Sequence, residues 1–263
     1  MQAPVTHALV PCGGRGTRMA SIARDLPKEM LPVAGRPVVE HVARECAASG
    51  ITDLLVVVAP GKESIEAHLR PLAGTAGMPA HIEFAVQQEA RGLADAIRLG
   101  RDFTADGPIA VALPDNLFVA DRPALRQVID VAYATGKSTV AVVGIAAEEA
   151  SRRGATAVYR GTVEPRGQFR ITHIPDKGAK SASFDTGGAA MAYTGVGRYA
   201  FGVRLWQAIE EVDDALPKDQ ELDDIPVMQL LLHGGLLTGC LIRGDFLDVG
   251  VPAGYHEANA RLA

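Results

Sequence analysis

The sequence has few cysteines and no excess of basic charge. Its three cysteines form no CxxC pair, and their odd number leaves at least one without a disulfide partner within the chain. A reducing compartment is the simplest setting for such a chain, so we expect a cytoplasmic protein. Lysines and arginines total 26 against 31 aspartates and glutamates, a formal net charge of −5. A general nucleic-acid binder would show a basic excess, so that class is disfavoured.

Long apolar runs and metal-binding histidine patterns are also missing. No run of about 18 apolar residues occurs, and the N-terminus lacks a basic start followed by an apolar stretch, so we expect neither membrane insertion nor secretion. The seven histidines show no HxxxH or HExxH spacing, which disfavours a zinc site. Hydrophobic residues nevertheless make up 48% of the chain. That fraction is too rich in core-forming residues for a disordered chain.

Short apolar segments of strand type alternate with segments of helical period through the first half of the chain. This alternation is typical of βαβ units and predicts an α/β protein with a Rossmann-like, mostly parallel sheet flanked by helices. The expected strands are 7–11, 53–59, 81–86, 108–113 and 138–145, and the expected helices are 37–49, 62–69, 92–103 and 121–135.

The pattern changes from about residue 151 onward. Shorter β-type pieces punctuated by glycine predict a smaller mixed β sub-region beside the parallel sheet. No repeat or long linker appears, so we expect one unit with a cleft. The pieces are 155–161, 168–174 and 188–199, followed by helices near 203–212 and 224–233, a strand at 235–244 and a last helix that begins at Pro252.

A glycine-rich loop follows the first expected strand, with the sequence PCGGRGTRM at 11–19. Glycines at this place let the backbone N–H groups approach and cradle a phosphate, although a plain strand-to-helix turn also explains them. The Gly-Lys-Ser/Thr ending of a Walker loop is absent. The dinucleotide fingerprint would need glycine at Met19 and an acidic residue near Ala59. An NAD-dependent dehydrogenase is therefore disfavoured.

Two further motifs give the loop a specific context. PKEMLPV lies at 27–33 and GRPVVEH at 35–41. Together with the loop, they resemble the sugar nucleotidyltransferases, also called NDP-sugar pyrophosphorylases, and most closely the bacterial UTP:glucose-1-phosphate uridylyltransferases and glucose-1-phosphate thymidylyltransferases. The resemblance implies the nucleotide-diphospho-sugar transferase fold over 1–263, with a nucleotide-binding half at 1–150. The half at 151–263 would bind the sugar and supply a second metal ligand.

The resemblance also implies the reaction and its residues. A nucleotidyl group passes from an NTP, with UTP or dTTP favoured, to a sugar 1-phosphate, and pyrophosphate leaves. Arg18, Lys28 and Lys177 match the catalytic cations, and Asp115 and Asp248 match the ligands of a Mg²⁺ cofactor. The implied nucleotide-binding residues are Pro11, Gly13, Gly14, Gly16, Thr17, Gln87, Gly92 and Asp115, and the implied sugar-binding residues are Asn116, Thr156, Asp176, Lys177, Gly197 and Glu221.

These residue types suit a reaction between two anions. At an effective dielectric of about 20, two unit charges about 4 Å apart repel by about 4 kcal/mol, so cations must offset the repulsion. Arginine clamps phosphate oxygens, lysine supplies a point charge, and Mg²⁺ takes one or two carboxylates. Simpler interpretations remain open: Asp115 and Asp248 can each belong to a turn, Lys28 can be a solvated charge, and Lys177 can lie in a hairpin.

Several features leave the substrates open. Gln88 beside Gln87 leaves the register of the base-reading glutamine uncertain by one position. GATAV at 154–158 stands where relatives carry an aromatic-Gly-Val, and Asp176 replaces a longer glutamate. CTP, GTP or ATP, or a non-glucose, cyclitol or amino-sugar phosphate, are therefore alternatives. A catalytically silent nucleotide-binding regulator is the alternative of another class. The resemblance further implies a homo-oligomer, a dimer or tetramer, with no nucleic-acid or membrane partner.

Overall fold

The structure of the chain is a computed structural model that describes residues 4–14, 16–148, 158–176, 189–217 and 219–263. The expected sugar-site residues Thr156 and Lys177 lie outside the described residues, as does most of the GATAV segment.

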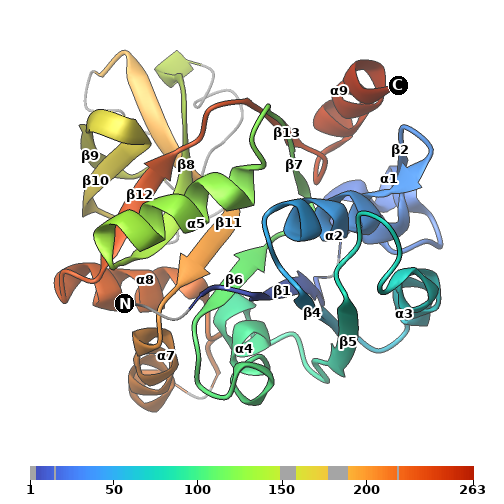
Figure 1. Ribbon diagram of the computed structural model, residues 1–263, viewed down its shortest axis with the longest axis horizontal. Helices are drawn as coiled ribbons and strands as arrows, with labels where there is room; N and C mark the ends of the chain where they lie inside the picture. Colours follow the sequence, from blue (N-terminus) through green and yellow to red (C-terminus); the bar gives the residue numbers. More distant parts are fainter. Residues whose placement is uncertain (1–3, 15, 149–157, 177–188, 218) are drawn as a thin grey trace.

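A nine-stranded sheet forms the centre of the molecule (Figure 1). Its strand order is β5-β4-β1-β6-β11-β8-β12-β10-β9. The first four strands in this order are parallel, β11 runs antiparallel between β6 and β8, and β12 is parallel to β8. The strands are β1 (His7–Cys12), β4 (Asp53–Val58), β5 (His81–Val86), β6 (Ile109–Ala112), β8 (Ser138–Ala146), β9 (Arg160–Val163), β10 (Gln168–His173), β11 (Met191–Phe201) and β12 (Leu237–Leu241).

The expected α/β class is confirmed, and the mixed β sub-region continues the same sheet. β10 pairs antiparallel with both β12 and β9, so the second half of the chain extends the edge of the parallel sheet. Two short ribbons lie outside it, β2 (Pro32–Val33) with β3 (Arg36–Pro37) and β7 (Asn116–Val119) with β13 (Asp245–Asp248).

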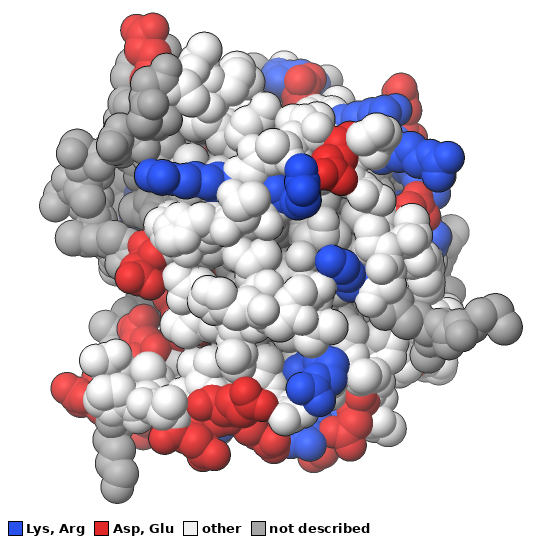
Figure 2. Space-filling model, turned by 90° about the vertical axis from the view of Figure 1, so that its left-hand side faces the viewer, with Lys and Arg blue, Asp and Glu red and all other residues white. Residues whose placement is uncertain are grey.

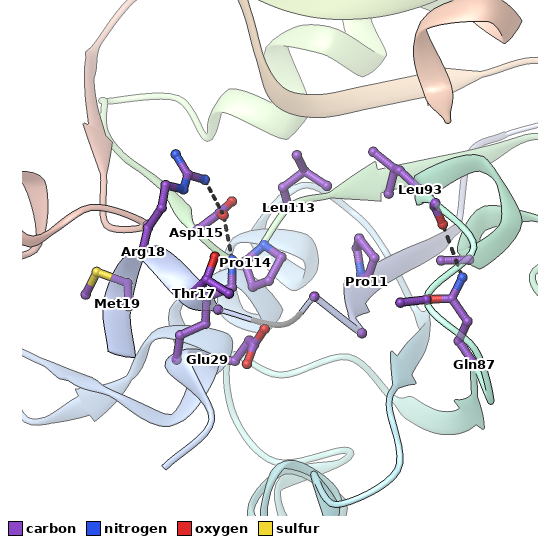
Figure 3. Close-up of a pocket in the computed structure, with 18 of the residues that line it drawn as sticks. Pro11, Thr17, Arg18, Met19, Glu29, Gln87, Leu93, Leu113, Pro114 and Asp115 are labelled. Atoms are coloured by element: carbon purple, nitrogen blue, oxygen red, sulfur yellow. Dashed lines mark hydrogen bonds and ion pairs between the residues drawn. The ribbon is translucent and has the colours of Figure 1, made fainter. Parts of the chain in front are cut away.

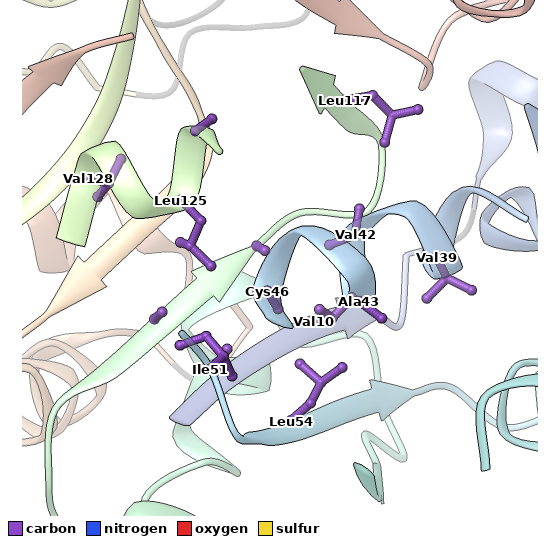
Figure 4. Packing of buried hydrophobic residues seen from close by; sticks show 14 of the residues in the cluster. Val10, Val39, Val42, Ala43, Cys46, Ile51, Leu54, Leu117, Leu125 and Val128 are labelled. Atoms are coloured by element: carbon purple, nitrogen blue, oxygen red, sulfur yellow. The ribbon is translucent and has the colours of Figure 1, made fainter. Parts of the chain in front are cut away.

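Helices cover both faces of the sheet, because alternate strand residues point to opposite faces and both sets are apolar. Val10 and Leu54 pack under α2, as Figure 4 shows, whereas Leu9 belongs to the cluster beneath α4, α7 and α8. The longer helices are α2 (Val38–Ala48), α3 (Glu63–Leu69), α4 (Leu93–Arg98), α5 (Ala124–Thr135), α7 (Arg204–Ala215), α8 (Asp224–His233) and α9 (Pro252–Leu262).

Short helical segments occupy the loops. The helix expected at 92–103 ends at Arg98, and Gly100 then lies so close to β6 that a Cβ there would come within 2.8 Å of Ile109 Cδ1. The short segments are α1 (Ala20–Ala23) and the 3₁₀ turns η1 (Thr17–Met19), η2 (Lys28–Met30), η3 (Arg70–Leu72), η4 (Asp102–Thr104) and η5 (Pro165–Gly167).

Three properties of the described residues bear on the expectations from the sequence: the length and hydropathy of the helices, the surface charge and the state of the cysteines. Of the helices in the described part of the chain, none has the length and apolar character needed to cross a membrane. Figure 2 shows one face of the molecule, where acidic side chains gather along the lower edge and the basic side chains drawn are scattered. The three cysteines are buried and form no disulfide.

A buried arginine joins the sheet to the loop after β6. Arg198 of β11 is fully buried, and its guanidinium makes a bidentate pair with Glu45 of α2 at 3.0 and 2.7 Å. The remaining N–H groups donate to the carbonyl oxygens of Leu113, Asn116 and Gly197 at 2.7–2.9 Å, so each donor of the guanidinium has an acceptor. This contact was not predicted from the sequence.

We expect Arg198→Met to lower the free energy of unfolding by about 3–5 kcal/mol. The substitution leaves the Glu45 carboxylate without its ion-pair partner and removes the donors to three carbonyl oxygens. Urea unfolding at 25 °C measures the change. The matched control is Arg204→Met, which removes an exposed arginine and should change stability by about 0.5 kcal/mol or less. An equal effect of the two substitutions would contradict the role of this contact.

Candidate active site

A cavity of about 570 Å³ opens at the carboxyl ends of the parallel strands β1, β5 and β6. Ligands of open α/β sheets bind at this edge. Most of the expected site residues line the cavity: Pro11, Gly13, Gly14, Gly16, Thr17, Arg18, Lys28, Gln87, Gly92, Asp115 and Glu221.

The glycine-rich loop forms the floor between the two ends of the cavity. Gly16 has a φ of +65° and begins the η1 turn, a conformation that favours glycine. Gly13 lies against Gln87, where a Cβ would come within 2.7 Å of Oε1. Glycine at 16 therefore suits the positive φ of the loop, and glycine at 13 lets the loop lie close to the Gln87 side chain.

The cationic end of the cavity surrounds Asp115, which follows β6. Lys28 Nζ lies 2.7 Å from Asp115 Oδ2, and Arg18 Nη2 lies 4.0 Å from the same oxygen (Figure 3). Burial acts to raise the pKa of Asp115, but the charges of Lys28 and Arg18 outweigh it and hold that pKa below its usual value. Conversely, burial acts to lower the pKa of Lys28, and Asp115 outweighs burial and raises it. Both groups are therefore charged near neutral pH.

A second carboxylate meets Asp115 from the far end of the chain. β13 pairs with β7 so that Asp248 lies opposite Asn116, and Val249 N donates to Asp115 O at 2.9 Å. A Cβ at Gly250 would come within 3.0 Å of Asp115 Oδ2 and 3.1 Å of Asp248 Oδ1, so both carboxylates border the same glycine. Burial and the charge of Asp115 raise the pKa of Asp248.

This carboxylate pair fits a hard divalent cation. Two carboxylates that converge at a half-buried position destabilise each other unless a cation lies near them. Within the described ranges, no group of three or more His, Cys, Asp or Glu side chains could hold a metal. A pair suits Mg²⁺, which is commonly bound by one or two carboxylates with phosphate oxygens and water completing the shell.

A second ion pair, which the sequence did not predict, lies at the floor of the cavity. Lys62 Nζ lies 3.0 Å from Glu29 Oε2 and also donates to Cys12 O at 2.5 Å and Gly14 O at 2.8 Å. Burial raises the pKa of Glu29, although the charge of Lys62 opposes that shift. One ammonium thus joins three segments: the glycine-rich loop, the PKEMLPV segment and the start of α3. No local sequence pattern indicates this contact, because Lys62 and Glu29 lie 33 residues apart.

The other end of the cavity is formed by Gln87 and the start of α4. The Gln87 side chain is buried and lines the cavity, whereas Gln88 is exposed and does not line it. Gly92 has a φ of +114°, and a Cβ there would come within 2.3 Å of Leu222 O. Glycine at 92 therefore lets the start of α4 approach the segment that carries Glu221 and Asp223.

Some expected sugar-site residues are not among those that line the cavity. Asn116 and Gly197 lie beneath the Asp115 loop, where Gly197 N donates to Asn116 Oδ1 at 2.7 Å. Asp176 is exposed and accepts a hydrogen bond from Gln229 Nε2 at 3.0 Å. The cavity is also lined by residues that were not predicted: Met19, Glu29, Ala90, Leu93, Ala96, Leu113, Pro114, Asp223 and Gly250.

The fold and cavity are those of an α/β protein with a ligand-sized site at the carboxyl ends of its parallel strands, and comparison with known proteins gives its family. The profile of the nucleotidyl transferase family matches residues 7–263, so the chain belongs to that family. Members of this family generally use a divalent metal ion. Nucleotidyl transfer is therefore the class of reaction.

Two individual relatives and one solved structure resemble the chain over nearly its full length. The chain is 29% identical to a putative UTP–glucose-1-phosphate uridylyltransferase of Bacillus subtilis (strain 168), over 95% of this chain and 94% of that protein. It is also 29% identical to another UTP–glucose-1-phosphate uridylyltransferase of the same strain, over 98% and 91%. A crystal structure of a UDP-glucose pyrophosphorylase complexed with UDP-glucose shares the fold, with a TM-score of 0.82, 23% identity and 98% coverage of both chains.

Lys62→Met should lower the Tm by roughly 10 °C, because it leaves the Glu29 carboxylate buried without its ion-pair partner. Thermal unfolding followed by circular dichroism measures this shift. Adding Glu29→Gln to the variant should recover much of the loss, since the buried charge is then removed. Lys137→Met, at an exposed lysine, is the control. A Tm within about 2 °C of the control would contradict this account.

Proposed function

We propose that the chain transfers the nucleotidyl group of UTP or dTTP to a hexose 1-phosphate and releases pyrophosphate. The observation that carries the proposal is the meeting of Asp115 and Asp248 beside Lys28 and Arg18 at the glycine-rich loop. The names of the relatives support UTP and glucose 1-phosphate as the first substrates to test.

The reaction follows from the charges of the cavity. An oxygen of the sugar phosphate attacks the α-phosphorus of the NTP, a new P–O bond forms, and the bond to pyrophosphate breaks. The attacking phosphate is already ionised, so no general base is required. Backbone N–H groups of the loop would orient the triphosphate, while Arg18 and Lys28 would offset charge repulsion. Electrostatic positioning therefore supplies most of the rate.

Asp115 and Asp248 are the residues that would hold Mg²⁺. A Mg²⁺ ion held there would supply positive charge that offsets the negative charge of the triphosphate. The ion pair of Lys28 with Asp115 places the lysine ammonium beside the same carboxylate. The cationic end of the cavity would thus receive the triphosphate.

The second half of the chain would bind the sugar phosphate. Glu221 and Asp223 line the cavity from 151–263, opposite the nucleotide-binding half at 1–150. Carboxylates are suitable acceptors for sugar hydroxyl groups. Lys177 would meet the sugar phosphate, as the resemblance implies. We further propose that residues 1–263 form a single unit and that the protein is a homodimer or homotetramer located in the cytoplasm.

Pyrophosphate release tests the activity directly. Five NTPs, namely UTP, dTTP, CTP, GTP and ATP, are combined with glucose 1-phosphate, galactose 1-phosphate and glucosamine 1-phosphate in Mg²⁺. We expect release above background with UTP or dTTP, and its loss on chelation with EDTA. Silence of the whole panel with folded protein would contradict the proposed function and favour a silent regulator.

Asp115→Asn should lower kcat by about 10²–10³-fold, because it removes one carboxylate charge where the metal would bind. Steady-state kinetics in saturating Mg²⁺ measures the loss, and circular dichroism checks the fold. Asp121→Asn is the matched control, since Asp121 is exposed beyond the far end of β7. Turnover equal to that of the control would exclude Asp115 as a metal ligand.

A further inference from the structure

The Gln87 amide is held from one side by two oxygens. Gln87 follows β5, and its Nε2 donates to Gly92 O at 3.1 Å and to Asp95 Oδ2 at 2.8 Å. Its Oε1 lies on the side of Gly13, where a Cβ would come within 2.7 Å of it. Both amide hydrogens are therefore used against the protein, and an oxygen faces the glycine-rich loop.

The chemistry of the partners fixes this orientation. A backbone carbonyl and a carboxylate accept hydrogen bonds and donate none. A flipped amide would set Oε1 against both acceptors with no hydrogen between them, and buried unsatisfied groups are costly. Gln87 and Asp95 are each more than nine-tenths buried, so water cannot easily replace the lost contacts. The oxygen of Gln87 must face the cavity.

Asp95 is itself held from behind. Arg98 Nη2 donates to Asp95 Oδ1 at 2.6 Å, and Arg98 Nη1 donates to Asp213 Oδ2 of α7 at 2.7 Å. Arg91 Nη1 lies 3.9 Å from Asp95 Oδ1. Arg98 and Arg91 thus hold Oδ1 of Asp95, while Oδ2 accepts the hydrogen bond from Gln87.

This end of the cavity differs from the cationic end. Figure 3 shows Gln87 and Leu93 at one side, Arg18 and Asp115 at the other, and Pro11 between them. Pro11, Leu93 and Ala96 supply apolar walls. A carbonyl oxygen among apolar walls repels phosphate but suits a flat base that offers an N–H group.

We propose that Asp95 is a positioning residue that, with the Gly92 carbonyl, locks the Gln87 amide so that the cavity selects pyrimidines with an N3–H donor. Uracil and thymine carry that donor, whereas cytosine has a lone pair at N3. This inference rests on the proposed function for the identity of the ligand, an NTP, and on the base-reading role that the family resemblance implies for Gln87. What it adds is the role of Asp95, which holds the Gln87 amide in the orientation that base reading needs.

Nucleotide binding tests the inference without requiring turnover. Isothermal calorimetry in Mg²⁺, without sugar phosphate, compares UTP, CTP and N3-methyl-UTP. We expect the unaltered protein to bind UTP at least about tenfold more tightly than either analogue, the effect of one lost hydrogen bond in a desolvated site. An unaltered protein that binds N3-methyl-UTP as tightly as UTP would overturn the proposal.

Two substitutions at Asp95 separate positioning from general stability. Asp95→Leu keeps a similar shape without an acceptor, and its preference for UTP over CTP should fall toward that of Gln87→Met. Asp95→Asn retains an acceptor oxygen and should rescue most of the preference. Asp102→Asn removes an exposed carboxylate beyond α4 and should leave the preference unchanged. The KM for sugar phosphate should not change in Asp95→Leu.

The possible outcomes keep this inference distinct from the proposed function. Selective binding of UTP without pyrophosphate release would support the locked amide and contradict the transferase activity. Release with equal use of UTP and CTP would support the activity and overturn the locked amide. A full preference for UTP in folded Asp95→Leu would overturn the role of Asp95. If Asp95→Leu does not fold, Asp95→Asn provides the test instead. A loss of preference for UTP over CTP in Asp95→Asn as large as that in Gln87→Met would then overturn the role of Asp95.

Discussion

The architecture of the site depends on the buried contact between Arg198 and Glu45. A guanidinium removed from water needs an acceptor for each N–H, and it finds them in α2, in its own strand and on both sides of Asp115. The sheet changes from parallel to antiparallel at β11, next to β6. The arginine thus holds the loop that carries Asp115 at the edge where strand direction changes, and Glu45 also accepts from Leu125 N at the start of α5.

Other charged side chains of the cavity also have partners within the protein. Lys28 is held by Asp115, and Lys62 by Glu29 and two loop carbonyls, so these cations are fixed before any ligand arrives. A fixed cation loses little conformational freedom when it binds phosphate, and its field acts without reorganisation. Arg18 is the exposed member of the set, since 65% of its side chain is accessible to solvent.

The sequence predicted features that depend on neighbours along the chain. Strand β5 was predicted with its observed bounds, since HIEFAV carries strand-forming residues between breakers, and the glycine-rich loop was placed because its motif is contiguous. The roles of Arg198 and Lys62 were not predicted, because their partners are distant in sequence and isolated charges resemble solvated ones. Asp248 was placed beside Asp115 only through resemblance to a family. The physical reason, pairing of β7 with β13, is a long-range contact.

Charge fixes one end of the cavity and hydrogen-bond polarity fixes the other. At the cationic end, an NTP would be recognised by the negative charges that every NTP shares, so this end would not distinguish one base from another. At the Gln87 end, the amide NH₂ group donates to Gly92 O and Asp95 Oδ2, so the amide oxygen is the acceptor that Gln87 presents to the cavity. A lone acceptor distinguishes N–H from a lone pair because the wrong partner leaves two acceptors facing each other. The proposal therefore places selectivity among nucleotides at the end of the cavity where charge contributes least, and it assigns that selectivity to Asp95 behind Gln87 as well as to Gln87 itself.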